Sequence, residues 1–172
     1  MSISDNLKHI KSSLPETVTL VAVSKFHPAE ALREAYDAGQ RVFGESRVQE
    51  LVAKQPELPT DIEWHFIGTL QKNKVKYIAP FVHTIQSIDS MELLKEIDKH
   101  AAKNNRTIRV LIEVHIAAES SKHGFSIEEC RTLFREKQFA SYPHVCIAGL
   151  MGMATFTDDT RQIEKEFQSL QK

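Results

Sequence analysis

The stretch Thr19-Leu20-Val21-Ala22-Val23-Ser24-Lys25 is a short apolar run, rich in β-branched residues, that ends in a single lysine. Such a run is typical of a β-strand, which we expect over residues 18–24. Pro28 stands where the first turn of a helix tolerates proline, and Gly39 suits the end of that helix. The stretch therefore predicts a strand followed directly by a helix, with Lys25 at the junction.

The same strand–helix unit recurs along the chain at intervals of roughly 20 to 25 residues. This alternation implies parallel strands joined by helical crossovers. Three of the expected helices begin with a capping signal: Ser46 with Gln49, Asp89 with Glu92, and Ser126 with Glu129. Strands are expected over 18–24, 41–44, 63–68, 81–87, 107–116 and 145–151, and helices over 2–12, 28–39, 46–54, 71–79, 89–104, from 126 onward, and over 158–170.

Two architectures fit this alternation: an open doubly wound sheet and a (β/α)8 barrel. The dinucleotide signature GxGxxG is absent after the first strand, which disfavours the doubly wound sheet. A complete barrel takes about 250 residues, so six units fit the beginning of a barrel better than a whole one. We therefore expect an α/β fold of the (β/α)8 TIM-barrel type with about six units, forming a single domain over residues 1–172 that is incomplete at its C-terminal end.

Composition narrows the class of protein and of partner. The 172 residues are 41% hydrophobic and 26% charged, with a net charge of −1, so no broad attraction to nucleic acid or anionic membrane is expected. No apolar run reaches the ~18 residues of a membrane span, and residues 1–8 lack the apolar centre of a signal peptide. Cys130 and Cys146 form neither a CxxC pair nor a disulfide framework, which favours a cytoplasmic location. No feature identifies a protein partner.

Parallel strands place their carboxyl ends on one face, where barrel enzymes carry their active sites. Glycine at a strand end lets the backbone approach a ligand closely, although for any one of these glycines an ordinary turn is the better interpretation. The residues expected on this face are Lys25, Gly44, Ser46, Gly68, Ser87, His115, Met151 and Gly152.

Lys25 has two interpretations at this stage. A lysine at a strand end can simply extend its charged head into water. Alternatively, its amine can attack a carbonyl carbon to form a Schiff base, which requires the neutral amine and an environment that lowers its pKa. The end of the first barrel strand suits the second role.

The eight histidines include neither an HExxH nor an HxH pattern, so no metal site is expected. His65 lies inside a strand, where a hydrogen-bonded wall residue is a better interpretation than a base. His115 lies near a strand end and can face either the pocket or a helix.

Four segments of the chain form an ordered set: 22–25 (AVSK), 43–50 (FGESRVQE), 65–74 (HFIGTLQKNK) and 119–125 (ESSKHGF), continued by 149–151 (GLM) and 158–159 (DD). Together they resemble the pyridoxal 5′-phosphate homeostasis proteins, the YggS/PROSC family. The resemblance implies a barrel similar to the alanine racemase N-terminal domain, with pyridoxal phosphate held as an internal aldimine on Lys25 and with Ser46, His65, Gly68 and Met151 around it. It also implies a carrier or regulator of vitamin B6 and amino-acid balance, without an established catalytic activity.

The sequence departs from the family pattern in three places. Ser46 stands where the family has asparagine, and Glu113-Val114-His115 stands where the family has Gln-Val-Asn. The later segments that supply much of the family's phosphate cradle, one bearing serine and glycine and one of the form Arg-x-Gly, have no counterpart. We therefore expect the last two strand–helix units to be missing.

Two other classes of function remain open from the sequence. One is a pyridoxal phosphate-dependent racemase or lyase, which needs an acid and a base on opposite faces of the substrate; Tyr36, Tyr77 and Tyr142 fall in expected helices or loops, so no catalytic residue beyond Lys25 is identified. The other is a fragment that does not bind the cofactor, or an assembly in which another chain pairs with the open sheet edges.

Overall fold

A single parallel sheet forms the centre of the computed structural model, which describes residues 2–119 and 123–171. Each strand is hydrogen-bonded to its neighbours in sequence, in the order β1-β2-β3-β4-β5-β6. A doubly wound sheet would reverse its strand order partway, whereas a barrel winds in one direction. The expected TIM-barrel type is therefore confirmed. The strands are β1 (Ala22–Val23), β2 (Val42–Glu45), β3 (Glu63–Phe66), β4 (Thr84–Ile88), β5 (Ile108–Glu113) and β6 (Val145–Met151).

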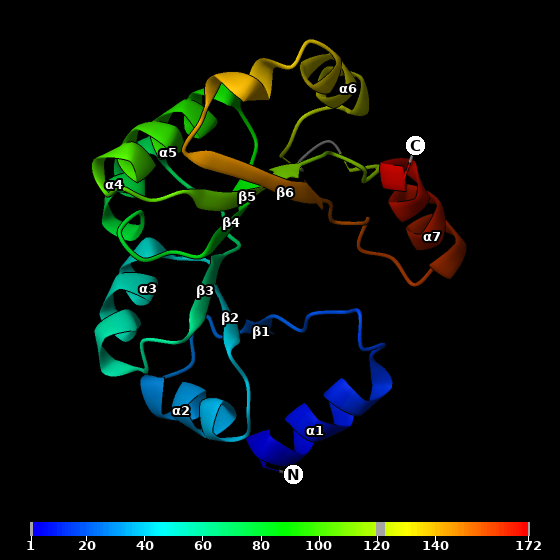
Figure 1. The fold of residues 1–172 in the computed structure, drawn as a ribbon. Helices are drawn as coiled ribbons and strands as arrows, with labels where there is room; N and C mark the ends of the chain where they lie inside the picture. Colours follow the sequence, from blue (N-terminus) through cyan, green and yellow to red (C-terminus); the bar gives the residue numbers. More distant parts are fainter. Residues whose placement is uncertain (1, 120–122, 172) are drawn as a thin grey trace.

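Helices connect the successive strands. Four of them, α2 to α5, line one side of the curved sheet, while α1 and α7 lie near its two ends (Figure 1). Among the described residues, no helix has the length and apolar character needed to cross a membrane. The α-helices are α1 (Ile3–Ser13), α2 (Ala29–Asp37), α3 (Val48–Lys54), α4 (Val75–Ile78), α5 (Met91–Lys103), α6 (Ile127–Arg135) and α7 (Thr160–Gln168), and the 3-10 helices are η1 (Gln55–Glu57), η2 (Lys72–Lys74), η3 (Gln138–Ser141) and η4 (Ser169–Gln171).

The first strand is shorter than the sequence predicts. The ladder of β1 covers only two residues, because β1 is an edge strand whose one partner, β2, begins at Val42. The carbonyl of Leu20 is instead satisfied by the side chain of Gln40, whose Nε2 donates to it over 2.8 Å. The apolar pattern identified the strand correctly, but the length of β1 is limited to the two residues that pair with β2. By contrast, β6 has the predicted bounds.

The expected capping signals have mixed outcomes. The capping box of Ser126 with Glu129 is present at the start of α6. The prediction for Ser46 with Gln49 is wrong: α3 begins at Val48, and Arg47 occupies the cap position without a side-chain cap.

Two other helix starts also differ from the prediction. Ser90, rather than Asp89, caps α5 and accepts a hydrogen bond from the amide of Leu93 over 3.3 Å. The helix expected over 71–79 divides into the 3-10 turn η2 and the short helix α4.

The hydrophobic core lies between the sheet and helices α2 to α5. Side chains from adjacent strands meet there; the rings of Phe43 on β2 and Trp64 on β3 have centroids 6.1 Å apart. From α5, Leu94 and Ile97 are fully buried against this layer. The core thus covers one face of the sheet, and the carboxyl ends of the strands remain available for a functional site.

We predict that Leu94→Ala lowers the free energy of unfolding by about 2 to 5 kcal/mol, because it removes a fully buried side chain and leaves a cavity. Urea denaturation followed by circular dichroism measures this loss. Val52→Ala on the exposed side of α3 is the control and should change stability by less than about 1 kcal/mol. Equal effects of the two substitutions would contradict this placement of the core.

Candidate functional site

The parallel sheet brings the expected site residues to one end of the molecule. Lys25 follows β1, Ser46 follows β2 and Gly68 follows β3, while Met151 is the last residue of β6. These positions lie far apart along the chain, and the order of the parallel strands brings them to the same end of the sheet. His65 lies within β3 rather than at its end.

Lys25 lies in a turn immediately after β1. Its side chain is exposed, and Nζ lies 5.9 Å from the centroid of the Phe26 ring. The guanidinium of Arg47 lies over the same ring at 4.7 Å. The amine therefore stands at the open end of the sheet, accessible to a carbonyl compound and with an arginine nearby.

Ser46, Gly68 and Ser87 connect the ends of three neighbouring strands. The hydroxyl of Ser87 donates to the carbonyl oxygen of Gly68 over 2.6 Å. A Cβ atom added to Gly68 would lie 2.3 Å from the carbonyl oxygen of Ser46 and 2.8 Å from its Cα. Only glycine allows this approach, which brings the ends of β2 and β3 together.

At the far edge of the site, Met151 is paired in register with Glu113 of β5. Glu113 is buried, and this burial raises the pKa of its carboxyl group, with a further contribution from the negative charge of Asp89. The amide of His115 donates to the carbonyl of Phe125, while His115 Nδ1 is buried without a hydrogen-bond partner in the described ranges.

The loop predicted to resemble the family over 119–125 is described only in part, since residues 120–122 lie outside the described residues. Gly124 has φ +117°, and a Cβ there would lie 2.8 Å from the carbonyl oxygen of Glu113. The loop therefore returns to the end of β5, next to the other strand ends.

His65 is held within the sheet. Its Nδ1 lies 2.7 Å from Nε2 of Gln86, and its ring is stacked on His83 with centroids 5.6 Å apart. Burial, followed by the positive charges of His83 and Arg109, lowers the pKa of His65 to about 4. The imidazole is therefore neutral at pH 7, in agreement with a hydrogen-bonded wall residue.

Glu63, His65 and His83 form the one cluster in the described ranges whose ligand atoms all lie within 4.8 Å of each other. Their two imidazole rings are nearly parallel, at 7°, and Glu63 is exposed.

One charged group at the site was not anticipated from the sequence. Lys54 of α3 is buried beneath the turn that carries Lys25, with Nζ 2.7 Å from Oε1 of the fully buried Glu45. In the sequence, Lys54 follows Glu50 by four residues, which is typical of an exposed helical pair. The burial of this lysine depends on β1 and β2, so the local pattern could not reveal it.

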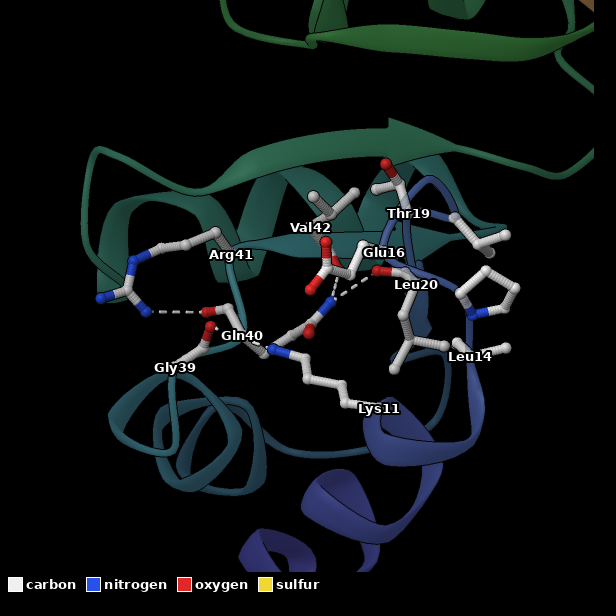
Figure 2. A pocket seen from close by; sticks show the side chains of 11 residues that line it. Lys11, Leu14, Glu16, Thr19, Leu20, Gly39, Gln40, Arg41 and Val42 are labelled. Carbon is white, nitrogen blue, oxygen red and sulfur yellow. Dashed lines mark hydrogen bonds between the residues drawn. The ribbon is translucent and has the colours of Figure 1, made fainter.

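A pocket of about 340 Å³ lies at the opposite end of the sheet (Figure 2). Its wall includes Lys11, Gln40 and Arg41, and the Gln40 amide donates to the carbonyls of Leu20 and Val42. These bonds join the residues before β1 to the start of β2. Because barrels carry their sites at the carboxyl ends of the strands, we assign this pocket a structural role.

We predict that Gly68→Ala destabilises the protein by about 2 kcal/mol or more, because the added Cβ would clash with the backbone of Ser46. Thr69→Ala, at the exposed neighbouring position, is the matched control and should change stability by about 0.5 kcal/mol or less. Urea denaturation of both variants measures the difference. A Gly68→Ala protein as stable as the control would rule out the close backbone contact.

We also predict a pH dependence that originates at His65. The unfolded chain protonates this imidazole near pH 6.5 and the folded chain only near pH 4, so stability is complete above pH 6.5 and declines as the pH falls towards 4. After a discount for solvent screening, the loss between pH 7.5 and pH 5 amounts to about 1 to 2 kcal/mol. His65→Gln should lack this component in urea denaturation at the two pH values; an unchanged loss would contradict the assignment.

Comparison with known proteins gives a consistent result. The family model described as "Alanine racemase, N-terminal domain" matches residues 1–172. The pyridoxal phosphate homeostasis protein of Aquifex aeolicus is 40% identical over 154 residues, which cover 89% of this chain and 67% of the relative. That of Pasteurella multocida is 37% identical over 182 residues, with 97% and 76% covered.

Solved structures extend the comparison. PipY of Synechococcus elongatus without PLP superposes with a TM-score of 0.93 at 37% identity, and the form with PLP bound with a TM-score of 0.89 at 36% identity. Each alignment covers 99% of this chain and 79% of PipY. An alanine racemase of Clostridium difficile superposes with a TM-score of 0.81 at 14% identity, over 99% of this chain and 46% of the racemase, which shows a shared fold alone.

Proposed function

The chain belongs to the family of pyridoxal phosphate homeostasis proteins, and from this membership we propose that it binds pyridoxal 5′-phosphate as a Schiff base on Lys25. The observation that carries the proposal is the place of Lys25: an exposed amine at the carboxyl end of β1, in a chain 36% identical to a protein whose structure contains PLP. We further propose that the protein acts as a carrier or regulator in vitamin B6 and amino-acid balance.

The residues at the strand ends fit such a ligand. Pyridoxal phosphate would supply an aldehyde, and the amine of Lys25 would hold it as a Schiff base with release of one water molecule. Gly68 and Ser46 follow β3 and β2 at the same end of the sheet as Lys25, and the close contact of their backbones brings these two strand ends together. We place Ser46, Gly68 and Met151 around the ligand and the neutral His65 in the wall behind it.

The positions of the three tyrosines favour a carrier over a racemase or lyase. Racemization needs an acid or base opposite Lys25. Tyr36 donates its hydroxyl proton to Asp61 from α2, Tyr77 is exposed on α4, and Tyr142 follows η3. None of the described tyrosines is at the carboxyl ends of the strands. Cys130 and Cys146 are both free, which supports the proposed cytoplasmic location.

We predict that pyridoxal phosphate added to the protein gives the visible absorption band of a Schiff base, and that borohydride reduction attaches the ligand to the peptide containing Lys25. Lys25→Ala should lose both signals, because it lacks the amine. Lys76→Ala, which removes an exposed lysine of α4, is the matched control and should retain them. No band in the parent protein, or an undiminished band in Lys25→Ala, would overturn the proposal.

The same preparation separates a carrier from an enzyme. Incubation of the loaded protein with L- or D-alanine, followed by chiral chromatography, should show no inversion above the rate given by free pyridoxal phosphate. Turnover at ordinary enzyme rates, about 1 s⁻¹ or faster, would favour the racemase instead.

A further inference from the structure

Two side chains of α3 hold the backbone on both sides of Lys25. The carbonyl oxygen of Ser24 accepts a hydrogen bond from Lys54 Nζ over 2.9 Å. The amide of Phe26 donates to Glu50 Oε2 over 2.9 Å. Lys25 lies between these two bonds, while its own side chain remains exposed.

The ammonium of Lys54 is fully engaged. Its three N–H donors are directed at the Ser24 carbonyl, at Glu45 Oε1 over 2.7 Å and at Glu50 Oε2 over 3.3 Å. The side chain of Lys54 is 10% exposed and that of Glu45 is fully buried. Burial of charged groups is costly unless they are paired, and a buried pair is weak evidence of a gain in stability by itself. A role in positioning the neighbouring turn gives a reason for the buried pair of Lys54 and Glu45.

The turn that these bonds hold is conformationally unusual. Phe26 has φ +66°, in the left-handed region that a side chain with a Cβ rarely adopts. Such a conformation persists only where its surroundings determine it, and it is found frequently at functional sites. Ser24 on the other side is also fixed: its amide donates to the Gly44 carbonyl over 2.9 Å and its hydroxyl to Glu45 Oε1 over 2.6 Å.

We infer that Glu50 and Lys54 are positioning residues for Lys25, which fix the turn over 24–26 so that the amine is presented to its ligand in one backbone arrangement. Neither residue needs to touch the ligand. The inference rests on the proposed Schiff base, and it assigns the gain to preorganisation: a turn already held by α3 loses little entropy when the amine forms its bond. A ligand that makes no bond to Lys25 gains nothing from the arrangement.

That distinction defines the experiment. Pyridoxal phosphate and pyridoxine 5′-phosphate share the ring and the phosphate, but only the first has the aldehyde that bonds to Lys25. We expect Glu50→Ala to weaken the binding of pyridoxal phosphate about tenfold or more, and that of pyridoxine phosphate by about twofold or less, as measured by equilibrium titration.

Two variants control for indirect effects. Glu50→Gln keeps an oxygen that accepts from the Phe26 amide, so it should restore most of the preference for the aldehyde ligand. Glu57→Ala removes an exposed acidic residue just beyond α3 and should leave both affinities unchanged. The double variant Lys54→Met with Glu45→Gln removes the buried charges together and should repeat the selective loss.

The outcomes separate this inference from the function on which it rests. A parent protein without a Schiff base contradicts the proposed function itself. A parent with a Schiff base and a Glu50→Ala variant with unchanged affinity, or with equal losses for the two ligands, overturns the positioning role alone.

Discussion

The buried ammonium of Lys54 joins three parts of the chain that the sequence keeps apart. Its partners are a backbone carbonyl after β1, the carboxylate of Glu45 at the end of β2 and that of Glu50 within α3. A charge removed from water must find such partners, so the three elements are held together at this ammonium. The carboxyl ends of β1 and β2 are thereby fixed relative to each other, and the rest of the site is built outward from them.

From the ends of β1 and β2, backbone contacts continue across the sheet to the ends of β3 and β4. Gly68 approaches Ser46 so closely that no side chain fits between them, and Ser87 binds the Gly68 carbonyl. The side chains in these contacts are absent or short, so little side-chain entropy is lost when they are fixed. These contacts hold the ends of β2, β3 and β4 together, while the side chain of Lys25 remains exposed.

Sequence reasoning predicted the parts of this structure that depend on local pattern. The apolar periodicity predicted β6 to the residue, and the capping box of Ser126 with Glu129 is formed as expected. The prediction was wrong where a tertiary contact competes with a local sequence signal. Ser46 and Gln49 have the spacing of a capping box, but α3 begins at Val48 and the backbone of Ser46 lies against Gly68. Lys54 was missed for the same reason, because its burial depends on strands distant in sequence. The strand–helix pattern placed Lys25 and its neighbours on the site face, and the family motifs then favoured the cofactor-binding interpretation of Lys25 over an ordinary exposed lysine.

The exposure of Lys25 bears on the kind of function proposed for it. Enzymes that use a lysine-bound cofactor gain from a site that excludes water, since electrostatic interactions are stronger there and side reactions are suppressed. A carrier has the opposite requirement, because release of its cargo depends on a water molecule that reaches the C=N bond. Lys25 is open to solvent and lies in a turn that is hydrogen-bonded on both sides, an arrangement that agrees with the carrier role proposed above.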